Sequence, residues 1–254
     1  MLLEKSLRTR LETKKILLMT HIVLGYPSMA INRRVISQMV EGGVDCIEMQ
    51  IPFSEPMADG PVILKANQDS LALGTSVSDC IEFGAEMTRK YEIPFLFMTY
   101  YNIIFKYGEE RFFKDCRSAG IQGLIVPDLP PEMGDEFFRL ATEYQIAPIL
   151  IFAPTSTDER MAELSNSATG FIYCAARRGV TGQQSEFDDD FDTYLARCRT
   201  ATALPLAVGF GIRNKEDVAA IIGKADMAVI GSETIRLVDE KGAEAVGPFI
   251  NSLR

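Results

Sequence analysis

Short apolar segments rich in strand-forming residues recur along the whole chain. Most of them are continuous rather than alternating, which is typical of strands covered on both faces. The pattern therefore predicts eight buried strands, at Ile16–Leu24, Cys46–Ile51, Pro94–Tyr100, Gly123–Val126, Ala147–Phe152, Gly170–Cys174, Pro205–Gly209 and Ala225–Ile230.

Segments with helical periodicity lie between these strands. Ser28 is placed to cap a helix whose apolar positions between Ile31 and Val40 follow the 3.6-residue period, and Gly42 ends it. The segments Glu109–Gly120 and Asn214–Gly223 repeat the scheme, each ending at a glycine before the next strand. Alternation of strand and helix is typical of βαβ units.

Eight such strand–helix units favour one α/β fold, a single (β/α)₈ TIM barrel. The alternative, an open dinucleotide-binding sheet, lacks the GxGxxG motif that would follow its first strand. No linker or break in composition divides the chain, so we expect one domain over residues 1–254. The segment Leu2–Thr13 predicts an additional N-terminal helix that covers the bottom of the barrel. We interpret the acidic run Glu186–Asp192 as a solvated loop or first helical turn rather than a metal site.

Composition narrows the classes of partner. The 254 residues are 47% hydrophobic and 24% charged, with a net charge of −9, which argues against nucleic acid or an anionic membrane surface as the main partner. No apolar run approaches the ~20 residues of a membrane span. The five cysteines form no CxxC pair and indicate free thiols in a reducing compartment, hence a cytoplasmic protein.

Candidate chemistry begins on the second predicted strand. With a period of two, Cys46, Glu48 and Gln50 share the face that points into the barrel. A carboxyl group in apolar surroundings is costly unless it is paired or protonated, and such surroundings make a general acid/base. The alternative, a Glu48 that only supports the fold through a hydrogen bond, stays open at this point.

The loop that follows this strand carries Asp59. It runs from Pro52 to Pro61 and is too long and too rich in proline for a simple connection. An isolated Asp before Gly is usually a turn residue. Its position just beyond Glu48 favours a functional role, because the loops after the strands of a barrel form its active site.

Glycine-bearing stretches follow the last three strands, at Gly179–Gly182, Gly209–Gly211 and Ile230–Ser232. Glycine lets backbone N–H groups approach an anion, and such loops bind phosphate in many barrels. The ten lysines fall outside the predicted strand ends, and the chain has a single histidine, His21. We therefore expect neither a Schiff-base lysine nor a metal site. We expect proton transfer on a phosphorylated small molecule instead.

Several motifs, in order along the chain, resemble those of one known family. They are Gly25-Tyr26-Pro27, Ile47-Glu48, the loop Pro52-Phe53-Ser54-Glu55-Pro56-Met57-Ala58-Asp59-Gly60-Pro61, Asp128-Leu129-Pro130, Ala147-Pro148-Ile149, Gly179-Val180-Thr181-Gly182 and Gly209-Phe210-Gly211-Ile212. They resemble the signature of tryptophan synthase α subunits.

The resemblance implies a carbon–carbon lyase of tryptophan biosynthesis that reversibly cleaves indole-3-glycerol phosphate to indole and D-glyceraldehyde 3-phosphate. Glu48 matches the general acid/base of the family, and Asp59 matches the residue that holds the indole N–H. Thr181 matches a residue that orders Asp59 when two mobile loops, around Asp59 and at Gly179–Gln184, close over substrate. The substrate-binding positions implied are His21, Tyr173, Thr181, Gly182, Phe210, Gly211, Gly231 and Ser232, with no metal.

The resemblance also implies a partner, the pyridoxal-phosphate β subunit, in an α2β2 heterotetramer, while the α chain itself carries no cofactor. The chain departs from the usual pattern at four positions. The family typically has glycine in place of Gln50, aspartate in place of Glu55 and alanine in place of Pro127. An aromatic residue usually lines the indole pocket near His21. The departures concern pocket shape and the partner surface. The alternatives are a free-standing indole-3-glycerol phosphate lyase, a catalytically silent binding or regulatory subunit, and another phosphate-binding barrel.

Overall fold

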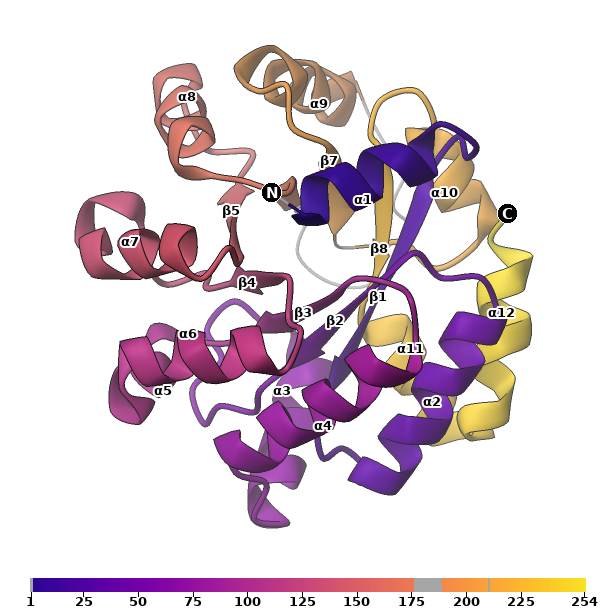
Figure 1. Ribbon diagram of the computed structural model, residues 1–254. Helices are drawn as coiled ribbons and strands as arrows, with labels where there is room; N and C mark the ends of the chain where they lie inside the picture. Colours follow the sequence, from indigo (N-terminus) through magenta and orange to yellow (C-terminus); the bar gives the residue numbers. More distant parts are fainter. Residues whose placement is uncertain (1, 176–188, 210) are drawn as a thin grey trace.

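Parallel strands close on themselves in the order β1 to β8, and the helices surround them (Figure 1). The computed structural model describes residues 2–175, 189–209 and 211–254. The predicted (β/α)₈ barrel with an N-terminal helix is confirmed. Its strands are β1 Leu17–Val23, β2 Cys46–Gln50, β3 Phe95–Met98, β4 Gly123–Ile125, β5 Ala147–Phe152, β6 Ile172–Ala175, β7 Leu206–Gly209 and β8 Met227–Ile230.

Helices connect the strands, and among the described residues two connections, β2 to β3 and β3 to β4, carry two α-helices each. The helices are α1 Leu2–Leu11, α2 Met29–Glu41, α3 Pro61–Ala72, α4 Val77–Lys90, α5 Tyr101–Tyr107, α6 Glu109–Ser118, α7 Asp135–Glu143, α8 Asp158–Ser167, α9 Asp189–Ala201, α10 Lys215–Ile221, α11 Ser232–Lys241 and α12 Val246–Ser252, with short 3₁₀ turns at η1 Pro131–Met133 and η2 Ala243–Ala245.

The helix α2 shows how local signals set these boundaries. The Ser28 side chain accepts a hydrogen bond from the backbone N–H of Ile31 at 3.2 Å and caps the first turn, as predicted. Gly42 is the C-cap, and Gly43 follows with φ of +88°, a conformation that L side chains rarely adopt. The chain thus leaves the helix and enters β2 within a few residues.

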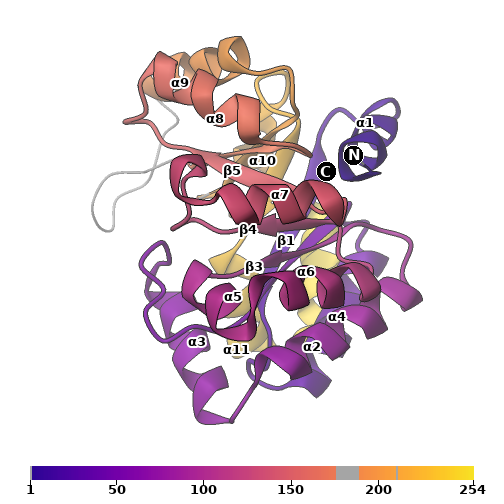
Figure 2. The same ribbon diagram turned by 60° about the vertical axis from the view of Figure 1, so that its left-hand side comes forward.

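The strand β2 has two buried faces, which explains its continuous apolar sequence. Ile47 and Met49 pack outward in the core between barrel and helices, and Cys46 packs inward. Leu3 and Leu7 of α1 are fully buried and join the same inner cluster as Cys46. The helix α1 therefore closes the amino-terminal end of the barrel, and α3 with the loop before it lies at the opposite end (Figure 2).

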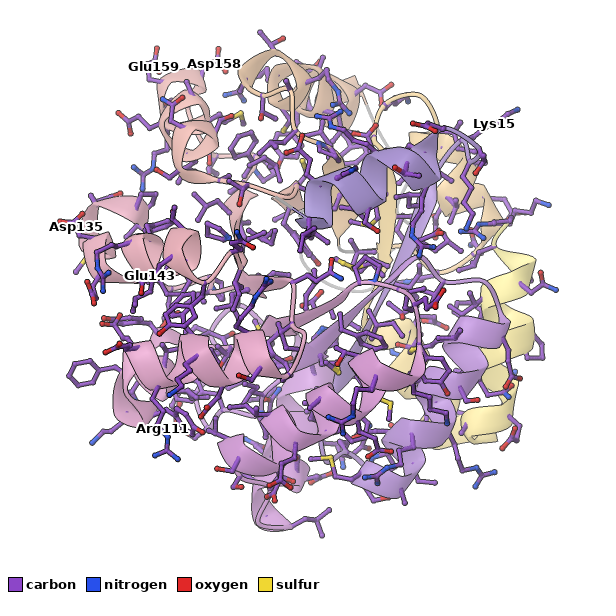
Figure 3. All side chains as sticks on the ribbon, viewed as in Figure 1. Lys15, Arg111, Asp135, Glu143, Asp158 and Glu159 are labelled. Carbon is purple, nitrogen blue, oxygen red and sulfur yellow. The ribbon has the colours of Figure 1, made fainter. Side chains whose placement is uncertain are left out.

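Charged side chains extend from the outer helices and loops (Figure 3), among them Lys15, Arg111, Asp135, Glu143, Asp158 and Glu159.

In the described residues, no helix has the length and apolar character that crossing a bilayer requires. Likewise, residues 2–175, 189–209 and 211–254 contain no group of three or more His, Cys, Asp or Glu side chains placed to hold a metal ion.

Candidate functional site

A cavity of about 180 Å³ lies at the carboxyl ends of the strands, opposite α1. Seven of the predicted site residues line it together, although they come from five strands or the segments that follow them. The cavity-lining members of the predicted set are His21, Glu48, Asp59, Tyr173, Gly211, Gly231 and Ser232. The arrangement brings both acidic side chains to one space, as a barrel active site requires.

Glu48 is buried on β2, with only 4% of its surface exposed, and points inward as the strand period predicts. His21 lies directly beside it on β1, because the two residues are register partners in the parallel pairing of these strands. Nδ1 of His21 is 3.1 Å from Oε1 of Glu48. Within the described part of the chain, Oε2 of Glu48 has no hydrogen-bond partner. One carboxyl oxygen is therefore held, and the other is available to a substrate.

Asp59 is held over the same cavity by two donors. The Gln50 side-chain Nε2 donates to Oδ2 at 2.7 Å, and the Tyr100 hydroxyl donates to the same oxygen at 3.1 Å. Tyr100 also accepts a hydrogen bond from the backbone N–H of Ala58 at 3.0 Å, which fixes the loop next to Asp59. Its ring stacks on Phe53 with centroids 5.0 Å apart.

The surroundings of Asp59 act on its pKa in opposing directions. Burial raises the pKa of Asp59, while the charge of His21 and the hydrogen bonds from Gln50 and Tyr100 lower it, and the net direction is upward. Both donors reach Oδ2, and neither reaches Oδ1. Within the described part of the site, this geometry suits a ligand N–H donor at Oδ1.

Tyr173 lies on β6 and lines the same cavity as these carboxylates. Burial raises the pKa of its hydroxyl well above the ordinary value, so the phenol keeps its proton. Its ring lies against Gly209 on the paired strand β7, where an added Cβ would be 2.1 Å from the Tyr173 hydroxyl oxygen. Only glycine at this position leaves room for the ring.

The opposite side of the cavity is suited to an anion. Ser232 is the first residue of the ten-residue helix α11, and Gly231 precedes it as the N-cap. Backbone N–H groups at such a helix start have no intrahelical acceptor and attract negative charge. Arg213 and Arg236 also line the cavity, and Arg236 pairs with Glu233 at 3.2 Å. These positive groups face the same cavity as the carboxylates of Glu48 and Asp59.

Three predicted site residues, Thr181, Gly182 and Phe210, lie outside the described residues, as does the predicted lid segment Gly179–Gln184. The structure adds others that sequence reasoning did not assign to the site. Gln50 and Tyr100 hold Asp59, and two arginines border the anion side. Strand position was the available signal for Gln50, which shares the inward face with Glu48, and for Tyr100, which ends a predicted strand.

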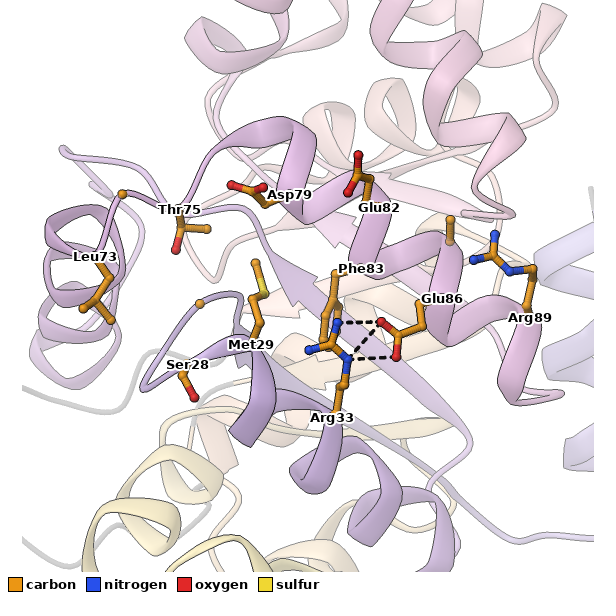
Figure 4. Close-up of a pocket in the computed structure, with 13 residues that line it drawn as sticks. Ser28, Met29, Arg33, Leu73, Thr75, Asp79, Glu82, Phe83, Glu86 and Arg89 are labelled. Atoms are coloured by element: carbon orange, nitrogen blue, oxygen red, sulfur yellow. Dashed lines mark hydrogen bonds and ion pairs between the residues drawn. The ribbon is translucent and has the colours of Figure 1, made fainter.

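A larger depression of about 830 Å³ lies between α2 and α4 (Figure 4). Two of its five charged side chains, Arg33 and Glu86, pair with each other. Arg33 makes three hydrogen bonds to Glu86, and its guanidinium also lies 5.3 Å from the centre of the Phe83 ring. Asp79 forms a capping box with Ser76, and the hydrogen bonds from Ser76 lower its pKa. We therefore assign the chemistry to the smaller cavity.

Comparison with known proteins agrees with this geometry. A family model described as "Tryptophan synthase alpha chain" matches residues 7–248. The chain is 73% identical to the tryptophan synthase alpha chain of Desulfotalea psychrophila and 53% identical to that of Syntrophotalea carbinolica, with full coverage of both chains in each case.

Solved structures give the same result. The fold matches tryptophan synthase from Mycobacterium tuberculosis with a TM-score of 0.91 and 29% identity, covering 99% of this chain and 96% of that one. It matches a chain of a tryptophan synthase complex from Pyrococcus furiosus with a TM-score of 0.85 and 28% identity, covering 93% of this chain and 96% of that one.

Proposed function

The chain belongs to the tryptophan synthase alpha chain family, and we propose that Glu48 is the general acid/base of its reaction. The reaction is the reversible retro-aldol cleavage of indole-3-glycerol phosphate to indole and D-glyceraldehyde 3-phosphate. The bond between ring carbon 3 and the hydroxyl-bearing side-chain carbon breaks. The ring carbon gains a proton, and the side-chain hydroxyl loses one to become the aldehyde.

The unpartnered oxygen of Glu48 is the observation that carries this assignment. Among the described residues, Oε2 has no hydrogen-bond partner although it is buried on the cavity, which is costly unless a ligand uses it. Oε2 gives a proton to ring carbon 3 and takes one from the hydroxyl, so Glu48 ends the cycle as it began. One carboxyl group is enough for both transfers.

Asp59 is assigned to the indole nitrogen. As the ring accepts a proton at carbon 3, positive charge develops on its N–H, and a nearby carboxylate stabilises that charge. Gln50 and Tyr100 occupy Oδ2 and leave Oδ1 for the ligand. Donors that fix the carboxylate before substrate arrives lower the cost of reorganisation during the reaction.

The phosphate is assigned to the start of α11, with Gly211, Gly231 and Ser232 around it. Gly182 and Phe210, which lie outside the described residues, belong to the same proposed set. Crystals soaked with inorganic phosphate or sulfate test this placement. We expect the anion within hydrogen-bond distance of the Ser232 backbone N–H, and an anion found only on another face of the barrel contradicts the assignment.

A β subunit is the proposed partner, in an α2β2 assembly. Three large apolar side chains are exposed on the connections that follow the neighbouring strands β2, β3 and β4, namely Met57 at 85%, Phe105 at 63% and Met133 at 75%. Each lies on a segment that follows the carboxyl end of its strand, and large exposed apolar side chains there favour a protein partner. We place this complex in the cytoplasm, and residues 1–254 as one domain within it.

An assay of indole release from indole-3-glycerol phosphate, with and without β subunit, tests the proposal as a whole. We expect turnover by the isolated chain that rises when β subunit is added. Fast release unaltered by β subunit favours the free-standing lyase. No release under either condition favours a silent binding subunit and removes the assigned role of Glu48.

A further inference from the structure

His21 and Glu48 form a buried pair at the centre of the site. His21 is 4% exposed, as is Glu48, and their closest nitrogen and oxygen atoms are 3.1 Å apart. The hydrogen bond uses Nδ1 of the imidazole and Oε1 of the carboxyl group. A side chain at position 21 without a donor would leave Oε1 as unpartnered as Oε2 is, because no other donor to either oxygen is found among the described residues.

Gln50 makes the corresponding contact to Asp59 and lies beside His21. Its Nε2 is used by Asp59, while its Oε1 and Nε2 of His21 are both buried and, in the described part of the structure, unpartnered. Each acidic side chain of the site therefore has one polar neighbour from β1 or β2. Members of the family that this chain resembles typically have glycine at position 50, which offers no side-chain donor.

The charges around His21 explain its protonation. Burial lowers the pKa of His21, but the charge of Glu48 and the hydrogen bond to it, together with the charge of Asp59, outweigh burial and raise the pKa. Tyr173 faces the pair from β6 as a neutral phenol, and the described cations on this cavity, Arg213 and Arg236, line its anion side.

We propose that His21 is a positioning residue for Glu48 and that the two side chains hold one proton in common. The proposal rests on the assigned role of Glu48 as general acid/base. Nδ1 keeps Oε1 fixed, so that Oε2 alone faces the substrate and makes both proton transfers. The shared proton lies either on Oε2 of Glu48, while the neutral imidazole donates its Nδ1–H to Oε1, or on the imidazole, whose two nitrogens are then both protonated. The pair begins and ends each turnover with that one proton.

A shared proton has a consequence for pH dependence. A lone carboxyl group loses its proton at a lower pH than a carboxyl–imidazole pair loses its last one, because the imidazole is the stronger base. The reaction needs that proton for ring carbon 3. The value of kcat/KM therefore falls as pH rises through the raised pKa of His21, and the fall moves to lower pH when position 21 no longer titrates.

Nuclear magnetic resonance tests the pair directly, because His21 is the only histidine in the sequence. The full chain, labelled with ¹⁵N-histidine and carrying no histidine tag, gives one imidazole titration. We expect a midpoint above the ordinary value of 6.5. In Glu48→Gln the midpoint should fall below that value, since burial then acts with one fewer opposing charge. An identical titration in both proteins overturns the proposal.

Two substitutions separate positioning from proton storage. His21→Phe removes both, and His21→Asn keeps a donor near the place of Nδ1 without a titrating group. The alkaline fall of kcat/KM should move to lower pH in both variants. Below that fall, kcat should drop about tenfold to a hundredfold in His21→Phe and less than about threefold in His21→Asn, with KM changed little in either, because the donor orients Glu48 rather than binding substrate.

The outcomes distinguish this proposal from the assignment on which it rests. If Glu48→Gln is inactive while both His21 variants keep the wild-type pH profile, the pair is refuted and the role of Glu48 stands. If Glu48→Gln turns over at the wild-type rate, the role of Glu48 fails first. Circular dichroism of each variant confirms that it is folded before its rate is compared.

Discussion

Two buried carboxylates lie three positions apart, one just before β2 and one at its centre, and their surroundings differ. Asp45, just before the strand, has no exposed surface. It forms ion pairs with Lys14 and Arg254 and accepts a hydrogen bond from the backbone N–H of Leu18 at 3.0 Å. Glu48 has one partner, His21, and an oxygen without one in the described residues.

The difference separates a carboxylate that stabilises the fold from one that does chemistry. A buried charge whose oxygens are all satisfied contributes to stability, since removing it leaves its partners uncompensated. A buried oxygen without a partner costs stability in the free protein and becomes useful when a ligand occupies it. Asp45 therefore ties the chain terminus and the segment after α1 to β2, while Glu48 is kept for substrate.

Glu48→Gln should produce the largest functional effect. The amide keeps the shape of the side chain and cannot exchange the proton, so kcat should fall by about 10²–10⁴-fold, the usual loss of a general acid/base. KM should change much less. Steady-state indole release measures both constants, and a rate near that of the wild-type protein contradicts the assignment.

Asp45→Asn should lower the stability of the fold and leave the activity unchanged, the reverse of what we expect for Glu48→Gln. We expect the free energy of unfolding to decrease by about 2–3 kcal/mol, less than the ~3–5 kcal/mol of a fully buried pair, because the Lys14 and Arg254 side chains remain 32% and 31% exposed. Urea denaturation measures the loss, and turnover per folded molecule should stay unchanged. Glu48→Gln is the matched control, with an unfolding free energy close to that of the wild-type protein.

Gly209→Ala tests how closely the cavity is packed around Tyr173. The added methyl group would lie 2.1 Å from the phenolic oxygen, so the ring must move, and turnover should fall about tenfold. On a Tyr173→Ala background the clash is absent, and the same substitution should cost little further activity. Equal losses on both backgrounds argue that Gly209 acts through something other than the tyrosine.

Thr181→Val gives the smallest expected effect. Thr181 lies outside the described residues, and its role as a latch toward Asp59 remains a prediction from the sequence. Loss of the hydroxyl should lower turnover while the melting temperature stays nearly unchanged, because a closing loop contributes little to the stability of the barrel. Full activity in this variant discards the latch.

Much of the barrel was determined by sequence alone. Continuous apolar segments predicted eight strands within a few residues, because a strand covered on both faces must be apolar at every position. The period of two also placed Glu48 inside the barrel, since successive side chains of a strand point to opposite faces. The loop around Asp59 indicated the family, which the comparisons confirm.

Only the tertiary structure decided which side chains meet inside the site. Residue period gives the face of a strand but not its register against a neighbour, so the pairing of His21 with Glu48 came from the alignment of β1 and β2. The contact of Gln50 with Asp59 required the return of the loop over the strand end. Arg213 and Arg236 reached the cavity through barrel closure. Register, loop path and closure depend on packing across the whole molecule, and no local pattern contains them.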